Sequence, residues 1–262
     1  MDAESHTSFS RSRRLRKRRD RVTRMLGGEG APIRRIGFLY FSARNFSWWI
    51  GSLFMVGSAC FAAGTLIAVS ANPKPAGIVF FVGSVFFTCA AYGQFLEVIN
   101  GDRGSGVEGT VRLLAWEPRL IEWHSTAIQF FGTLAFNVST FFAMFAALDA
   151  ESMKRLVWTP DVVGSAAFLI ASGLAYKEVR NGWRGRPEYS SESWITNLNL
   201  VGSIAFGISA IGAYVIPVNG ALLNAAASNG GTFIGALCFF FGAYVLWPEA
   251  AEAADEAVRP IG

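Results

Sequence analysis

Long uncharged, apolar stretches alternate with short charged segments along this chain. The six longest run over residues 48–69, 76–96, 125–148, 162–176, 195–218 and 230–247. A helix needs roughly 20 apolar residues to cross about 30 Å of hydrocarbon, and most of the stretches reach that length. The fourth is short, but Trp158 and Pro160 extend it at one end, and Lys177 can reach the interface at the other. The pattern predicts six transmembrane helices.

Strands are excluded as the spanning elements. The stretches lack the alternation of apolar and polar residues that a membrane-spanning strand shows. Backbone groups inside the hydrocarbon must find hydrogen-bond partners within the protein, so helices remain. With 52% hydrophobic and 16% charged residues, the chain is also too apolar for an ordinary soluble domain. The predicted fold class is therefore all-α, a six-transmembrane-helix bundle.

A five-residue unit recurs once in each stretch: glycine, a small residue, any two residues and phenylalanine. Chance would give about one match in a chain of this composition, so six matches indicate an internal repeat. The repeat predicts three two-helix hairpins in parallel orientation, over residues 37–100, 118–182 and 189–250. The glycine and phenylalanine positions of the unit are Gly57 and Phe61, Gly83 and Phe87, Gly132 and Phe136, Gly164 and Phe168, Gly202 and Phe206, and Gly235 and Phe239.

The unit lies on one helical face together with another small residue seven positions after its glycine, such as Gly64 or Ser139. In lipid, small residues let helix backbones approach closely and gain dispersion contacts. We therefore interpret this strip as the helix-packing seam, with phenylalanine filling the space beside the small residues. A substrate path along the same strip is the alternative interpretation.

Uncharged polar residues of the third and fifth helices are the candidates for such a path. Gln129 and Asn199 both stand three residues before the glycine of the unit, so they lie on the packing face. Such residues more often form hydrogen bonds between helices than contacts with a ligand. The full set is Gln129, Asn137, Ser139, Asn199, Ser203 and Ser209.

Polar residues at the predicted inner interface are in register with the unit. In each even helix a glutamate follows the glycine by 14 residues, and in each odd helix an arginine or tyrosine precedes it by 13 residues. At about 1.5 Å of rise per residue, these positions reach nearly the same height in antiparallel helices. A ring of the three glutamates that attracts cations is an alternative, and it requires the hairpins to surround an axis. The spacing itself predicts three links: Arg44 with Glu97, Arg119 with Glu178, and Tyr189 with Glu249.

The ends of the chain differ in charge from the rest. Residues 1–36 form a basic arm with eleven Arg and Lys against four Asp and Glu, a net charge of +7, whereas the remainder carries −3. Such an arm is typically disordered and anchors the cytoplasmic side by touching anionic lipid head groups. Nucleic acid is a less favoured partner, because the arm has almost no aromatic residues for base stacking. Residues 251–262 are predicted to form a short cytoplasmic tail.

The loops support the same orientation. Arg and Lys concentrate in the loops that lie on the side of the basic arm, which predicts that both termini are cytoplasmic.

Motifs for catalysis or for cofactor binding do not accompany these stretches. His6 and His124 are far apart in the sequence, and the three cysteines lie inside apolar stretches, so neither a metal site nor a disulfide framework is expected. Ionisable residues stand at helix ends rather than at helix centres, which disfavours proton-coupled transport. We expect no cofactor and no enzymatic activity.

The first predicted hairpin carries distinctive short motifs. They are Gly-Ser-Leu-Phe at residues 51–54 and Gly-Ser at residues 57–58 and 83–84. With these motifs, residues 37–100 resemble the YrhK-like domain, a two-helix membrane module of bacterial proteins whose function is not established. The resemblance implies a multi-pass protein of the bacterial inner membrane and transfers no site residues. The later hairpins depart from it, with Thr133 or Ala236 after the glycine.

Two functions are compatible with these features. The first is a structural, scaffolding or sensing membrane module, with the lipid bilayer and either a second copy or another membrane protein as partners. The second is a small-solute channel or transporter that uses the polar faces of the third and fifth helices. A dry seam filled by phenylalanine would favour the first function. A polar cavity would favour the second if it were bordered by Gln129, Asn137, Asn199 and Ser209.

Overall fold

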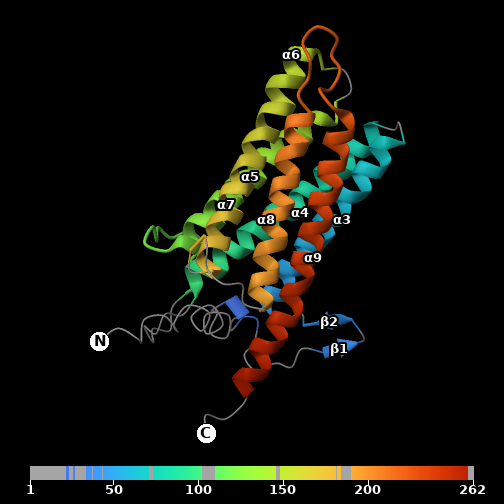
Figure 1. Cartoon of the computed structure of the whole chain (residues 1–262). Coiled ribbons are helices and arrows are strands. Elements are labelled where there is room, and N and C mark those ends of the chain that lie inside the picture. The colour runs from blue at the N-terminus through green and yellow to red at the C-terminus, as the bar shows by residue number, and fades with distance from the viewer. Residues whose placement is uncertain are drawn as a thin grey trace.

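The computed structural model describes residues 22–23, 26, 34–36, 38–42, 44–70, 73–101, 110–145, 148–180, 182–183 and 190–258. Within these residues, the regular elements are helices and one small β-hairpin, besides an isolated bridge between Val215 and Leu222 (Figure 1). Six helices, one of them lengthened by the turns before it, are long and apolar enough to cross a membrane, which confirms the predicted all-helical membrane protein. They are α3 (Phe46–Val69), α4 (Pro73–Asn100), α5 (Ile121–Ala143), α7 (Thr159–Val179), α8 (Ser191–Gly212) and α9 (Ala225–Val258).

The six long helices stand side by side in a closed ring. Each packs against its neighbours in the order α3, α4, α5, α7, α8 and α9, and α9 packs against α3. The contact that closes the ring includes stacked rings of Trp48 and Trp247, whose centroids are 6.0 Å apart. The indole Nε1 of Trp247 also donates to the backbone oxygen of Trp48 at 3.3 Å. The first and last long helices are therefore direct neighbours.

Glycines of the five-residue unit lie where consecutive helices approach each other. A Cβ atom added to Gly57 would lie 2.6 Å from the Phe87 ring and 3.0 Å from the backbone oxygen of Gly83. No larger side chain fits such a gap without moving a neighbour, so the phenylalanine of one helix covers the glycine of the other. The other two pairs are built in the same way, and they are Gly132 with Gly164 and Gly202 with Gly235.

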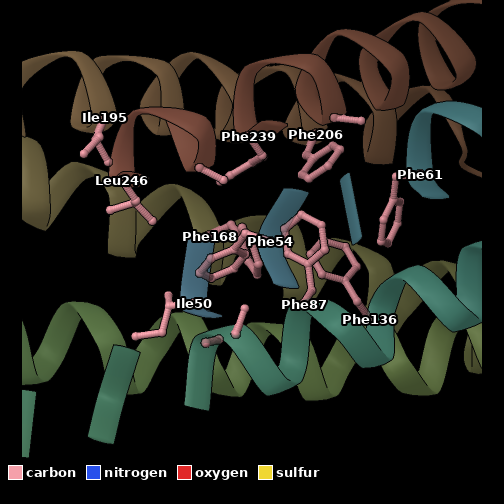
Figure 2. Close-up of a cluster of buried hydrophobic side chains, with 14 residues drawn as sticks. Ile50, Phe54, Phe61, Phe87, Phe136, Phe168, Ile195, Phe206, Phe239 and Leu246 are labelled. Atoms are coloured by element: carbon pink, nitrogen blue, oxygen red, sulfur yellow. The ribbon is translucent and has the colours of Figure 1, made fainter. Parts of the chain in front are cut away.

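Six phenylalanines, one from each long helix, meet in the middle of the ring (Figure 2). Their ring centroids lie 5.2 to 6.5 Å apart, in mostly edge-on or tilted arrangements that suit aromatic pairs. All six side chains are buried. We call this set the phenylalanine layer, and it consists of Phe61, Phe87, Phe136, Phe168, Phe206 and Phe239.

Additional helical turns lengthen α7 at its start. They are α6 (Ala150–Ser152) and a π-helix, η1 (Met153–Trp158). The Asp149 carboxylate caps α6 by accepting a hydrogen bond from the Ser152 backbone N–H at 2.7 Å. Hydrogen bonding to Ser152 lowers the pKa of Asp149 below its usual value. These turns supply the length that the fourth apolar stretch lacks, and Trp158 fixes them to α8 by donating to the backbone oxygen of Ala210 at 2.9 Å.

The β-hairpin was not predicted from the sequence. Strand β1 (Arg34–Ile36) falls within the basic arm, and it pairs antiparallel with β2 (Leu39–Phe41) just before α3. We call this end of the bundle, where α3 begins and α4 ends, the β-hairpin end. Most of the basic arm lies outside the described residues, and α9 continues past residue 250 into the predicted tail as far as Val258.

Candidate functional site

A polar pocket lies at the β-hairpin end, between α4, α5, α7 and α8. Its volume is about 90 Å³, which is room for roughly six water molecules. A smaller cavity of about 10 Å³, with room for one water, is lined by Phe54 and by Phe239 of the phenylalanine layer. Gln94, Gln129 and Asn199 border both spaces. The two spaces therefore adjoin at these amides, and the smaller one reaches Phe239 of the phenylalanine layer.

Three carboxylates surround the mouth of the pocket. Glu97, Glu122 and Glu178 belong to α4, α5 and α7, and each stands within one turn of the end of its helix. Glu97 accepts a hydrogen bond from the hydroxyl of Ser47 in α3. None of the lining residues in the described part of the chain is basic. Carboxylates are therefore the charged groups of the described lining.

Amide side chains form the next level of the pocket. Gln129 Nε2 donates to Gln94 Oε1 at 3.2 Å, which joins α5 to α4. Asn199 lies in α8 and faces α9, where a Cβ atom added to Gly242 would meet its Oδ1 at 2.8 Å. At about 1.5 Å per residue, Gln94 lies roughly 10 Å from Phe87 along α4, and Glu97 lies roughly 5 Å further. Carboxylates thus line the pocket near the helix ends and amides line it deeper, while phenylalanine lines the small cavity beyond the amides.

Side chains of α3 and α9 explain why the pocket lies on one side of the ring. Phe54 precedes its glycine by three residues, as do Gln129 and Asn199. Leu246 follows its glycine by eleven residues, as does Gln94. Phe54 and Leu246 are each 4% exposed and belong to the buried apolar cluster (Figure 2). Apolar residues at these two positions fill one side of the ring. On the other side the corresponding positions hold amides in α4, α5 and α8 and the small Ala175 in α7, which leaves a polar space.

Three of the other predicted polar residues connect helices instead of lining the pocket. Asn137 donates to Thr88 at 2.8 Å and joins α5 to α4. Ser203 shares a hydrogen bond of 2.8 Å with a serine of α7, and Ser209 donates to a backbone oxygen of α9 at 2.7 Å. Ser139 is buried within α5. Of the predicted polar path, Gln129 and Asn199 alone line the pocket among the described residues.

The structure does not bring together the first two predicted links. Within the described residues, no ion pair joins Arg44 to Glu97 or Arg119 to Glu178, and both arginines are exposed. The physical reason is that α3 begins at Phe46 and α5 at Ile121, so neither arginine is carried on a helical face. Spacing along a helix therefore does not fix where their side chains lie.

Tyr189 lies outside the described residues, so its link to Glu249 stays a prediction. In the alternative interpretation, three glutamates attract a cation, and the closed ring does provide the axis that it requires. Glu97 and Glu178 line the pocket, whereas Glu249 is buried in α9 and is not among the described lining residues. Glu122 is the third carboxylate that lines the pocket.

Sequence reasoning did not single out Gln94 or Glu122. Gln94 stands three residues before Glu97, and Glu122 stands seven residues before Gln129. Residues at these separations share a helical face, so extending the face of the unit toward the helix ends would have found both. Among the described residues, no group of three His, Cys, Asp or Glu side chains is arranged to hold a metal ion.

Comparison of the chain with protein-family models, with curated proteins and with solved structures finds no match. The resemblance of residues 37–100 to the YrhK-like domain therefore stays a prediction from their motifs.

Proposed function

We propose that the protein is a membrane-embedded sensing module that binds a small organic cation in the pocket at the β-hairpin end. The observation that carries the proposal is a polar pocket with a blind end. Carboxylates surround its mouth, amides follow, and the phenylalanine layer lies beyond them. A binding site that ends against packed aromatic rings suits a sensor better than an open channel.

The lining chemistry favours an ammonium or guanidinium group. Such a group carries several N–H donors, and carboxylate and amide oxygens accept them. A hydrogen bond to a charged group contributes about 1.5–3 kcal/mol, roughly twice the contribution of a neutral one. The carboxylates of Glu97, Glu122 and Glu178 come from three helices, which suits an organic ion with several donors. Ile195 and Val179 offer apolar walls for its methylene groups.

The proposal includes three two-helix hairpins with both termini on the cytoplasmic side. Contacts between α3 and α4, α5 and α7, and α8 and α9 support this arrangement, as do their paired glycines. The excess of Arg and Lys in the loops on the side of the basic arm supports the orientation. The pocket then receives its ligand from the cytoplasm. The bacterial inner membrane is the expected location.

Substitution of Glu97 tests the proposed site. We expect the full-length protein in nanodiscs to bind putrescine and methylammonium in calorimetric titrations. Glu97→Gln keeps the size of the side chain but removes its charge, so we expect binding about tenfold weaker, which corresponds to about 1.4 kcal/mol. Glu151→Gln is the matched control, because Glu151 is exposed in α6 at the other end of the bundle. We expect it to bind like the unsubstituted protein, and uncharged urea to bind to neither.

Transport of the same cation is the second candidate function. It is favoured by Gln129 and Asn199, because these side chains extend the pocket to the phenylalanine layer. Proteoliposomes loaded with methylammonium separate the two functions. Binding without release of the cation supports the sensor, and release through the protein supports the transporter. Absence of both binding and release would contradict the proposed site itself.

A further inference from the structure

The β-hairpin exposes an apolar surface on one of its faces. Arg34 pairs with Phe41 in the antiparallel register, so their side chains lie on the same side, together with that of Leu39. Tyr40 lies on the opposite side. Leu39 and Phe41 are 60% and 57% exposed, and Phe38 in the turn is 81% exposed. Apolar side chains are thus concentrated on a surface that no described part of the chain covers.

Hydrogen bonds from two helices hold this β-hairpin in place. The indole Nε1 of Trp48 in α3 donates to the backbone oxygen of Tyr40 at 2.6 Å. The hydroxyl of Tyr244 in α9 donates to the backbone oxygen of Phe38 at 2.8 Å. Both bonds use backbone atoms, so the side chains of Phe38 and Leu39 remain exposed, while Phe41 packs edge-on against Trp48 with ring centroids 5.2 Å apart.

A second apolar surface belongs to residues 112–117, between α4 and α5. Leu113, Leu114 and Trp116 are 66%, 80% and 77% exposed. Tyr92 of α4 donates to the backbone oxygen of Leu113 at 3.0 Å. Trp123 of α5 donates to the backbone one residue before Trp116, at 2.8 Å. Here too, helices hold the backbone and leave apolar side chains outside.

Asn100 fixes the beginning of this second segment. Its side chain accepts a hydrogen bond from the backbone N–H of Arg112 and donates to the backbone oxygen of the same residue, each at 2.8 Å. Arg112 also forms an ion pair of 3.0 Å with Glu117, and this bridge spans the exposed segment. The conformation is therefore set by side chains on both sides of the apolar residues.

A lipid surface fits both segments better than a protein partner. Phe41 and Trp116 each stand five residues before a membrane-crossing helix begins, so both segments lie close to the bilayer boundary. In Figure 1 they project from opposite sides of the bundle. A bilayer covers both sides at once, whereas one protein partner would have to reach around the bundle. Exposed Arg34 and Arg119 complement anionic head groups beside the apolar residues.

We infer that residues 34–41 and 112–117 are interfacial anchors, which place Phe38, Leu39, Leu114 and Trp116 among the lipids of an anionic leaflet. Aromatic and aliphatic side chains flanked by arginine are typical of segments that lie in the membrane interface. The anchors fix the depth of the pocket mouth relative to the head groups. This inference stands independently of the ligand of the pocket.

Fluorescence quenching tests the two anchors separately. The full-length protein would carry alanine at Cys60, Cys89 and Cys238 and an environment-sensitive fluorophore at Phe38→Cys or Leu114→Cys. In vesicles of phosphatidylcholine and phosphatidylglycerol, we expect nitroxide-labelled lipid to quench both labels several-fold more than aqueous iodide does. Asn219→Cys is the control, because Asn219 is exposed on the turn at the other end of the bundle. Its label should show the reverse preference.

Lipid charge gives a second readout. We expect lipid quenching of the label at residue 38 to be stronger in vesicles with phosphatidylglycerol than in vesicles without it. Replacing Arg34 and Arg35 by glutamine should reduce this difference at residue 38 and should leave the quenching at residue 114 unchanged. Iodide quenching at residues 38 and 114 equal to that at residue 219 would overturn the inference. Protection of the labels from iodide that rises with the density of protein in the vesicles, without quenching by lipid, would also overturn the inference. Such protection would show an interface between copies of the protein. The labels lie on different segments, so misfolding of one variant leaves the other as a test.

Discussion

Phe168→Ala is expected to lower the free energy of unfolding by about 3–5 kcal/mol, because it opens a cavity at the centre of the phenylalanine layer. Phe168 is 1% exposed, and its ring lies 5.2 Å from Phe136 and 5.5 Å from Phe239. In a bilayer, the loss consists mainly of dispersion contacts, which surrounding lipid cannot restore inside the ring. Reversible unfolding in mixed micelles, followed by near-ultraviolet circular dichroism, measures the change.

A pair of further variants identifies the cause of that loss. Phe131→Ala removes the same atoms from a side chain that is 58% exposed on the outside of α5, so we expect a far smaller effect. Phe168→Leu should recover most of the stability, because leucine refills much of the cavity. Equal losses for Phe168→Ala and Phe131→Ala would contradict a central role for the phenylalanine layer.

Gly231→Ala is expected to lower the free energy of unfolding by about 3 kcal/mol, at the upper end of the usual effect of overpacking. The added Cβ atom would lie 2.5 Å from the backbone oxygen of Ala205 and 2.8 Å from the backbone nitrogen of Ser209. Both are backbone atoms of α8, so no side-chain rotation relieves the clash. Helices α8 and α9 must separate, and thermal unfolding in nanodiscs should shift to lower temperature.

The preceding residue provides a matched control for this clash. A Cβ atom at Gly230 would meet nothing within 4 Å, although the two glycines occupy the same turn of α9. Gly230→Ala should therefore be neutral or should stabilise the protein by up to about 1 kcal/mol, since alanine favours helix more than glycine does. A loss of stability at Gly230 as large as that at Gly231 would show that the effect is not steric.

The helices could be predicted because lipid imposes a simple rule on sequence. A run of about 20 uncharged residues leaves few alternatives to a spanning helix, and all six runs became helices. The five-residue unit also identified residues that meet, since close backbone approach needs glycine and the neighbouring space needs a large side chain. Gly57 opposite Phe87 is an example.

The pocket could not be predicted in the same way, because it arises where helices carry different residues at the same distance from the glycine of the five-residue unit. Gln129 and Phe54 stand at equal distances before their glycines, yet one lines a polar space and the other fills the core. Whether such a position faces the pocket or the core depends on how the hairpins close into a ring. The periodicity of the sequence carries no information about that closure. The side chains of Arg44 and Arg119 could not be placed for a related reason. Both residues precede the first residue of their helix, so helical spacing does not determine where their side chains lie.

Because α9 packs against α3, the ring of helices is continuous. The spatial order of the helices therefore does not depend on which helix comes first in the chain. Trp48 and Trp247 stack across this junction as neighbours in an otherwise continuous circle. A circularly permuted chain, with the end of α9 linked to the β-hairpin and new termini between α4 and α5, retains the neighbours of every long helix. We expect such a permutant to assemble the same ring and to keep the pocket in α4, α5, α7 and α8.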